Sequence, residues 1–165
     1  MLTITLSYSA LAVALAVGHA ALWQAIRGRR ERLAALAEHC YRAIQVGVLL
    51  LAAGTILGGV WANESWGRFW GWDPKETWAL IALITYLIPL HGRHAGWLTD
   101  FGLATASVLG FMTIIMAWYG VNFILGVGLH SYGFGTGGLG YVIGVAAAEV
   151  AYVAWAWVSR PKATV

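Results

Sequence analysis

The stretch AIQVGVLLLAAGTILGGVW, residues 43–61, carries no charged side chain and predicts a helix that crosses a membrane. A bilayer core about 30 Å thick requires roughly 20 mostly apolar residues in an α-helix. Similar stretches lie on both sides of it, so the predicted spans are residues 2–26, 43–61, 74–93, 97–121 and 139–158. We therefore predict an all-α fold, a polytopic transmembrane helical bundle of about five spans that forms one domain over residues 1–165.

The composition of the chain excludes an ordinary globular protein in water. Of its 165 residues 60% are hydrophobic and only 10% are charged, which is too little charge to solvate a globular surface. The net charge of +3 does not indicate nucleic-acid binding, because the basic residues stand at the ends of apolar runs and form no patch. A single cysteine, Cys40, excludes an internal disulfide. The expected surroundings are a lipid bilayer, with no nucleic acid as partner.

The distribution of basic residues predicts the orientation of the spans. The segments after the first, third and fifth spans carry eight of them, and the opposite side carries only Arg68 and Lys75. The positive-inside rule then places the N-terminus outside and the C-terminus inside, with segment 61–78 and loop 122–138 also outside. No basic residue precedes Arg27, so residues 2–26 are expected to be a retained helix. The eight are Arg27, Arg29, Arg30, Arg32, Arg42, Arg93, Arg160 and Lys162.

The outer segment WANESWGRFWGWDPKETW, residues 61–78, is unusually aromatic and holds five of the ten tryptophans. If its first part is helical, Trp66, Phe69 and Trp70 fall on one face and form a flat aromatic shelf that suits a planar apolar ring. An ordinary aromatic belt at the membrane interface explains the same composition equally well. Spacing alone leaves both interpretations open.

The residues that follow the aromatic run predict the start of the third span. Asp73 is placed as its N-cap, Pro74 as its first residue and Glu76 at the third position, where an acid completes a capping box. A helix N-terminus beneath an aromatic pocket is also a place where a bound group is oriented. A structural and a binding role for Asp73 are therefore compatible.

The run WGRFWGWDPKETW, residues 66–78, resembles the WWD signature of the haem-handling membrane proteins of cytochrome c assembly. Its DPKETW part is similar to the CcsA (ResC-like) branch of that family. The likeness extends to YRAI at 41–44, GGVWAN at 58–63, GVNF at 120–123 and GLHSY at 128–132. It covers nearly the whole chain, which resembles only the C-terminal core of the longer family members.

The resemblance implies a function in cytochrome c biogenesis of the system II type, in the inner (cytoplasmic) membrane. It implies that haem b is presented at the outer face to the Cys-x-x-Cys-His site of apocytochrome c, together with a Ccs1/ResB-like membrane partner. The chain would then be part of a cytochrome c synthase (haem lyase) complex. No nucleophile with a partner base is visible in the sequence, so no catalytic residue is assigned.

The resemblance also implies which residues bind haem. His130 matches an outer histidine that ligates the iron axially, and His91 matches a histidine of the membrane span after the WWD segment. The position of a second outer histidine is occupied here by Thr5. The implied haem-binding residues of the outer segment are Trp66, Phe69, Trp70, Trp72 and Asp73.

Two histidines within the spans share one predicted depth. His19 and His91 each lie 17 residues after the first residue of their spans, or about 26 Å at 1.5 Å per residue. Two imidazoles at one level suit axial ligation of haem iron, whereas packing or snorkelling is the alternative. Glu149 falls in the middle of the fifth span, so we expect it to be neutral or hydrogen-bonded to a neighbouring helix.

Two other functions remain open. A membrane module that carries haem, or transfers electrons through it, without making thioether bonds needs the same aromatic site and histidines. A structural subunit that keeps the scaffold but binds no haem needs only the helices.

Overall fold

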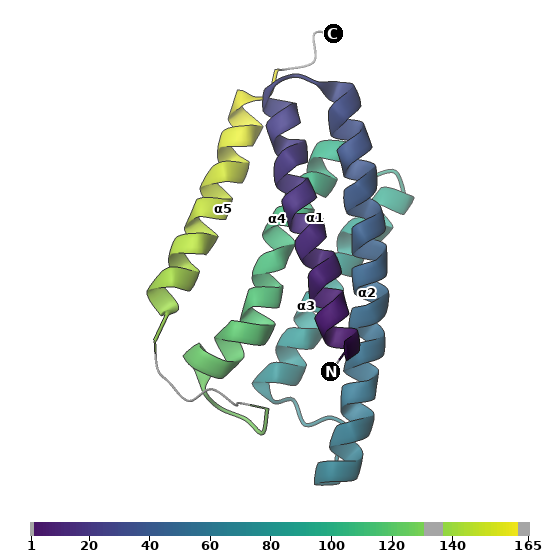
Figure 1. Ribbon diagram of the computed structural model, residues 1–165, viewed down its shortest axis with the longest axis vertical. Coiled ribbons are helices and arrows are strands. Elements are labelled where there is room, and N and C mark those ends of the chain that lie inside the picture. Colours follow the sequence, from purple (N-terminus) through teal and green to yellow (C-terminus); the bar gives the residue numbers. More distant parts are fainter. Residues whose placement is uncertain (1, 131–136, 162–165) are drawn as a thin grey trace.

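The computed structural model describes residues 2–130 and 137–161, and within these the chain is helical with no strand (Figure 1). This confirms the predicted all-α bundle. The Ser131 and Tyr132 positions of the GLHSY motif, part of loop 122–138, and Lys162 lie outside the described residues. The elements are α1 (Leu2–Ile26), α2 (Arg30–Trp66), α3 (Pro74–His94), α4 (Asp100–Ile115), the π-helix η1 (Met116–Leu125) that continues α4, and α5 (Leu139–Ser159).

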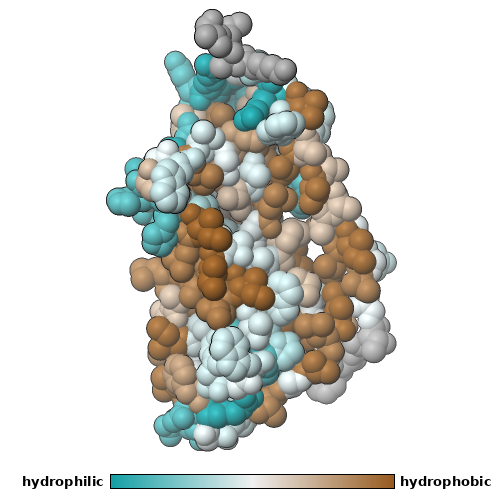
Figure 2. Space-filling view, turned by 180° about the vertical axis from the view of Figure 1, so that it is seen from behind, coloured by the Kyte–Doolittle hydropathy of each residue, from teal (hydrophilic) through white to brown (hydrophobic). Residues whose placement is uncertain are grey.

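Four helical stretches are long and apolar enough to cross a membrane: α1, α2, α4 together with η1, and α5. The fifth helix, α3, has 21 residues but is charged at both ends, with Lys75 and Glu76 in its first turn and Arg93 near its last residue. Figure 2 shows apolar side chains over the middle of one face and hydrophilic ones toward its top and bottom. An apolar outer surface of this kind is expected where lipid is the solvent.

Helix α2 is longer than the apolar stretch that predicted it. It has 37 residues, begins at Arg30 and ends at Trp66, whereas the predicted span was 43–61. Its first turns contain charged and alanine residues with high helix propensity, so the helix extends beyond the part that lipid can cover. The other end of α2, which finishes at Trp66, projects from the bundle (Figure 1).

The helix ends fall into two groups. The segment between α2 and α3 and the described residues directly after η1 lie at one end of the bundle, and the N-terminus of α1 is nearer this end (Figure 1). The turn between α1 and α2 and the end of α5 lie at the opposite end. The helices thus bring residues 66–74 and His130 to the same end of the molecule.

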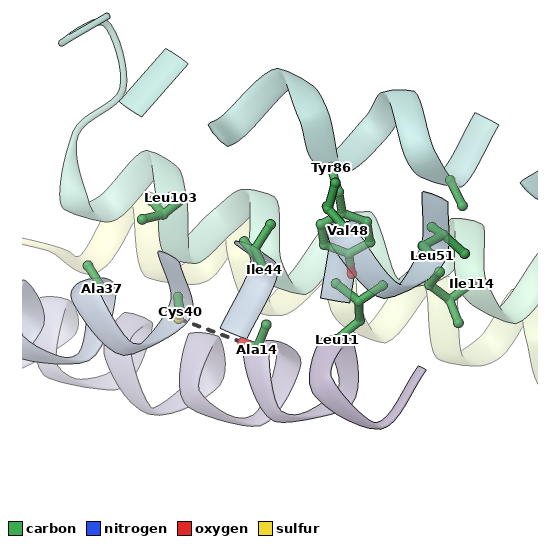
Figure 3. Close-up of a cluster of buried hydrophobic side chains, with 11 residues drawn as sticks. Leu11, Ala14, Ala37, Cys40, Ile44, Val48, Leu51, Tyr86, Leu103 and Ile114 are labelled. Carbon is green, nitrogen blue, oxygen red and sulfur yellow. Dashed lines mark hydrogen bonds between the residues drawn. The ribbon is translucent and has the colours of Figure 1, made fainter. Parts of the chain in front are cut away.

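The core lies between α1, α2, α3 and α4 (Figure 3). Leu11, Ile44, Tyr86 and Leu103 are fully buried there, and the Cys40 thiol lies 3.7 Å from the carbonyl oxygen of Ala14. By contrast, Ala156 is the only buried residue of α5. Helix α5 therefore packs at the edge of the bundle rather than in its core.

Candidate functional site

Helix α2 ends at Trp66, within the aromatic segment 61–78. Gly67 adopts a left-handed conformation, with φ of 69°, and its N–H donates to the carbonyl oxygen of Asn63. Glycine favours this conformation, which stops a helix. Phe69 and Trp70 therefore lie outside the helix, and the prediction that they share a helical face with Trp66 as a flat shelf is wrong.

The aromatic rings meet edge to face instead. Trp66 lies 4.9 Å from Trp61 and 4.7 Å from His130 between ring centroids, at interplanar angles of 76° and 77°. Trp70 and Trp72 form a separate pair at 5.7 Å and 88°. These geometries are the favoured ones for aromatic pairs. The structure thus brings Trp66 and His130 together, and it places Trp70 with Trp72.

Phe69 has a packing function. Its ring covers Gly59 of α2, where a Cβ atom would come within 2.7 Å of the ring. Phe69 is nevertheless almost half exposed. The Phe69 ring therefore packs the segment after α2 against that helix.

The start of α3 is the predicted capping box. Asp73 Oδ1 accepts hydrogen bonds from the backbone N–H groups of Lys75 and Glu76, each at 3.0 Å. In return, Glu76 Oε2 accepts from the N–H groups of Gly71 at 2.6 Å and Asp73 at 3.3 Å. Both carboxylates are buried. Local hydrogen bonds therefore hold Asp73 in place independently of any ligand.

The second oxygen of Asp73 meets the loop after η1. His130 Nδ1 lies 2.5 Å from Asp73 Oδ2. Ionised carboxylate oxygens only accept, so Nδ1 carries the hydrogen and donates it, and in the neutral ring Nε2 then presents a lone pair. No described residue is hydrogen-bonded to Nε2. Histidines that ligate metals commonly have their other nitrogen bonded to a carboxylate in this way.

Asp73 remains ionised in this environment. Its burial alone would raise its pKa, but hydrogen bonds from His130 and from the N–H groups of Glu76 and Lys75, with the charge that His130 carries when its ring is protonated, hold the pKa below its ordinary value. The carboxylate is thus available to fix the His130 ring at neutral pH.

Trp72 has a strained backbone beside Asp73. Among the described residues it is the one non-glycine residue with a positive φ, 57°. Glu76 bonds the N–H groups of Gly71 and Asp73 on either side of it, and its ring is 69% exposed. Strain of this kind persists only where surrounding contacts impose it. The sequence singled out Trp72 by type, whereas its conformation depends on contacts that no motif encodes.

Arg68 lies at the site, although the sequence predicted only that it is on the outer side of the membrane. Its guanidinium Nη2 lies 3.9 Å from Asp73 Oδ2, the oxygen that accepts from His130. The signal that it belongs to the site was its position inside the aromatic run, between Trp66 and Trp70.

Three ligand atoms from Asp73, Glu76 and His130 lie within 4.8 Å of one another, which is a grouping that could hold a metal ion. However, oxygens of both carboxylates already accept hydrogen bonds from the α3 cap, as described above. His130 Nε2 and Glu76 Oε1 have no hydrogen-bond partner among the described residues. His130 Nε2 is the nitrogen through which this group could bind a metal.

His19 and His91 are not brought together. His19 Nδ1 bonds the carbonyl oxygen of Leu15 at 2.9 Å, and its Nε2 lies 2.7 Å from Glu149 Oε2 on α5. Tyr152 stacks on the ring and donates to the carbonyl oxygen of His19. The expected hydrogen bond of Glu149 to a neighbouring helix is confirmed, and both nitrogens of His19 are engaged.

His91 lies on the side of α3 that faces α4. Its Nδ1 bonds the carbonyl oxygen of Leu87 at 2.8 Å, so that nitrogen carries the hydrogen, and no described group bonds Nε2. The residue lines an open apolar groove of about 650 Å³ between α3 and α4, together with Ile88, Trp97 and Leu109. This position leaves a lone pair beside an apolar surface.

Comparison with known proteins identifies similar chains. The model of the family described as cytochrome C assembly protein matches residues 1–130. A cytochrome c biogenesis protein CcsA of Prochlorococcus marinus (strain MIT 9303) is 50% identical over 107 residues, which are 64% of this chain and 32% of that protein. The CcsA proteins of Synechococcus sp. (strain WH7803) and Helianthus annuus are 51% identical over 107 residues and 50% identical over 93 residues, covering 64% and 56% of this chain and 32% and 29% of theirs. The chain spans about a third of the length of the curated relatives it matches.

Proposed function

The chain belongs to the cytochrome c assembly protein family, and from this premise we propose that it is the haem-binding membrane core of a haem transporter and cytochrome c synthase. The observation that carries the proposal is His130, whose Nδ1 is fixed by Asp73 while its Nε2 has no described partner. The Trp66 ring stands edge-on to the imidazole at 4.7 Å. A single fixed imidazole beside aromatic rings is a site suited to a flat metal complex.

In this proposal haem b is the cargo, and its iron and vinyl groups supply the chemistry that joins it to the cysteines of an apocytochrome. The residues of this chain bind and orient it. His130 ligates, Asp73 holds the ring and its tautomer, and Trp66, Phe69, Trp70 and Trp72 provide apolar contacts. No residue here is assigned as a general base, because thiol addition depends on positioning the two partners.

The proposal includes the orientation of the chain in the inner (cytoplasmic) membrane. The end of the bundle that holds residues 66–74 and His130 faces outward, and the end with the basic residues around Arg29 faces inward. Haem would thus be offered on the side where the Cys-x-x-Cys-His site of apocytochrome c is exposed. A Ccs1/ResB-like membrane protein is the proposed partner.

His91 is proposed as a transit ligand, because its Nε2 has no described partner and its groove is apolar. His19 is not included in this proposal, since Glu149 and the backbone of Leu15 engage both of its nitrogens. Haem in transit would therefore be bound by one histidine, His91, rather than by His19 and His91 together.

A second candidate is a haem-carrying or electron-transfer module that makes no thioether bonds. It is favoured by Thr5, which stands where the resemblance implies another outer histidine. An assay with reconstituted apocytochrome and the proposed partner distinguishes the two candidates, because only the synthase yields covalent haem.

The test of haem binding is a reduced-minus-oxidised spectrum of the purified chain in detergent, loaded with haem. We expect a haem signal in the parent, loss of its outer-site part in His130→Ala with at most the part bound at His91 remaining, and full retention in His39→Ala. His39 is the matched control because it lies near the other end of the bundle, with Nδ1 bonded to the carbonyl oxygen of Ala35. Equal haem content in the three proteins would remove His130 from the site.

A further inference from the structure

Arg68 lies where the chain turns from α2 toward α3, and its side chain folds back over Gly71. The guanidinium Nη1 occupies the position that a Cβ atom at residue 71 would take. Gly71 does not have the positive φ that would by itself require glycine. The space that Gly71 leaves is therefore used by the Arg68 guanidinium.

The charge of Arg68 has little compensation within the chain. Its nearest acidic oxygen, Asp73 Oδ2, is 3.9 Å away, beyond hydrogen-bond distance, and already accepts from His130. No described residue accepts a hydrogen bond from the guanidinium, whose side chain is 32% exposed. A planar guanidinium with unused donors matches a carboxylate, which it can bind through two parallel hydrogen bonds.

Arg42 and Arg93 have closer carboxylate partners than Arg68 has. Arg42 bonds Glu38 at 2.9 Å, and Arg93 bonds Asp100 at 2.8 Å. Arg160 lies over the ring of Phe101 at 4.2 Å. At the end of the bundle that holds residues 66–74, Arg68 and Lys75 are the only lysine or arginine among the described residues. Arg68 is thus the cation best placed to meet an anionic group of a ligand at this end.

We propose that Arg68 binds a carboxylate of the ligand at this site, which, resting on the proposed function, is a propionate group of haem. Both His130 and Arg68 approach Asp73 Oδ2, so one carboxylate links the iron ligand to the propionate-binding residue. Two fixed points, iron on His130 and a propionate on Arg68, would prevent the ring from rotating about the iron–imidazole bond. The ring edge that carries the vinyl groups would then have a defined direction.

The test compares haem with its dimethyl ester, in which both propionate charges are removed. Each is titrated into the purified full chain in detergent and followed by its absorption spectrum. We expect the parent to bind haem about 10- to 100-fold more tightly than the ester, as for hydrogen bonds between charged groups. Arg68→Gln should bind both alike, with the affinity for the ester unchanged.

Two further variants make the test specific. Gly71→Ala keeps the charge but displaces the flexible end of Arg68, so it should also lose most of the preference for haem over its ester. Arg42→Gln, a matched removal of an arginine on α2, should keep the parental preference. Retained binding of the ester shows in each case that the protein is folded.

The outcomes separate this inference from the proposed function. Failure of the parent to bind either compound would contradict the proposed function itself. Binding of both compounds with a preference that survives Arg68→Gln would overturn the assignment of Arg68 alone. Loss of apocytochrome-peptide binding in Arg68→Gln, with the preference for haem over its ester intact, would also overturn it, because the carboxylate would then belong to the polypeptide.

Discussion

The described part of the chain holds two histidine–carboxylate pairs, and they differ in which nitrogen the carboxylate meets. At the end of the bundle that holds residues 66–74, Asp73 bonds Nδ1 of His130 and leaves Nε2 without a described partner. Between α1 and α5, Glu149 bonds Nε2 of His19 while the backbone of Leu15 takes Nδ1. The same two chemical groups therefore make one site that can accept a ligand and one that cannot. We call His130–Asp73 the open pair and His19–Glu149 the closed pair.

The difference follows from secondary structure. His19, His39 and His91 are helical, and each uses Nδ1 to bond the carbonyl oxygen four residues earlier. His130 lies in a loop and has no such carbonyl, so a side chain must fix its ring. A carboxylate that reaches a helical histidine finds only Nε2, whereas one that reaches a loop histidine can take Nδ1. Position in a helix or loop thus determines whether the pair can ligate.

Breaking the closed pair should have the largest effect on stability and none on haem. Glu149→Leu leaves His19 Nε2 unpaired within the apolar part of the bundle. The two side chains are 35% and 16% exposed, so we expect a loss of about 2–3 kcal/mol, less than for a fully buried pair. The double variant His19→Leu/Glu149→Leu should recover most of it. Thermal unfolding in detergent measures both, and reduced haem binding in either variant would argue against a purely structural pair.

Weakening the open pair should act on haem rather than on stability. Asp73→Asn preserves an N-cap of similar strength but replaces the charged acceptor of His130. Partners of this kind are typically worth 10- to 100-fold in metal affinity. We therefore expect haem affinity to fall by about that factor while the unfolding temperature changes little. A large drop in that temperature with unchanged haem affinity would show that Asp73 serves only the helix.

Removing an aromatic ring near the open pair should have a smaller effect. Trp70→Ala should weaken haem binding by about 0.5–1.5 kcal/mol, the contribution of an aromatic contact beyond the area it buries. Trp118 of η1, which meets Tyr119 edge to face at 6.3 Å, provides the control. Haem titrations that give equal affinities for Trp70→Ala and Trp118→Ala would remove the reason to include Trp70 in the site.

The smallest expected effect is on the stability of the folded chain at low pH. Burial opposes ionisation of Asp73, but the bonds from His130 and the α3 backbone, with the charge of His130, keep its folded-state pKa below the ordinary 3.8. Ionised Asp73 therefore stabilises the folded chain above about pH 4. This contribution is lost as the pH falls through the lowered value. The unfolding temperature should fall more steeply below pH 4 in the parent than in Asp73→Asn, and parallel curves would contradict this.

The features of this chain that the sequence could predict are local ones. The capping box at Asp73 and the helical bundle depend on neighbouring residues and on apolar length. The aromatic shelf failed because one left-handed glycine, Gly67, ends α2 before Phe69. A common depth for His19 and His91 did not make them neighbours, because depth says nothing of the direction in which a side chain points. The bond of His130 to Asp73 joins residues 57 positions apart, and only the packing of α3 against η1 reveals it.

The claim that His130 Nε2 is the iron-binding atom is tested most directly by chemical rescue. His130→Gly removes the imidazole and leaves space for a free one, and His19→Gly is the matched variant of the closed pair. With haem loaded in detergent, we predict that His130→Gly lacks the parental ligand-field spectrum and regains it when imidazole is added. His19→Gly should keep the parental spectrum without imidazole. A parental spectrum in untreated His130→Gly, or its loss in His19→Gly with recovery on imidazole, would contradict the account.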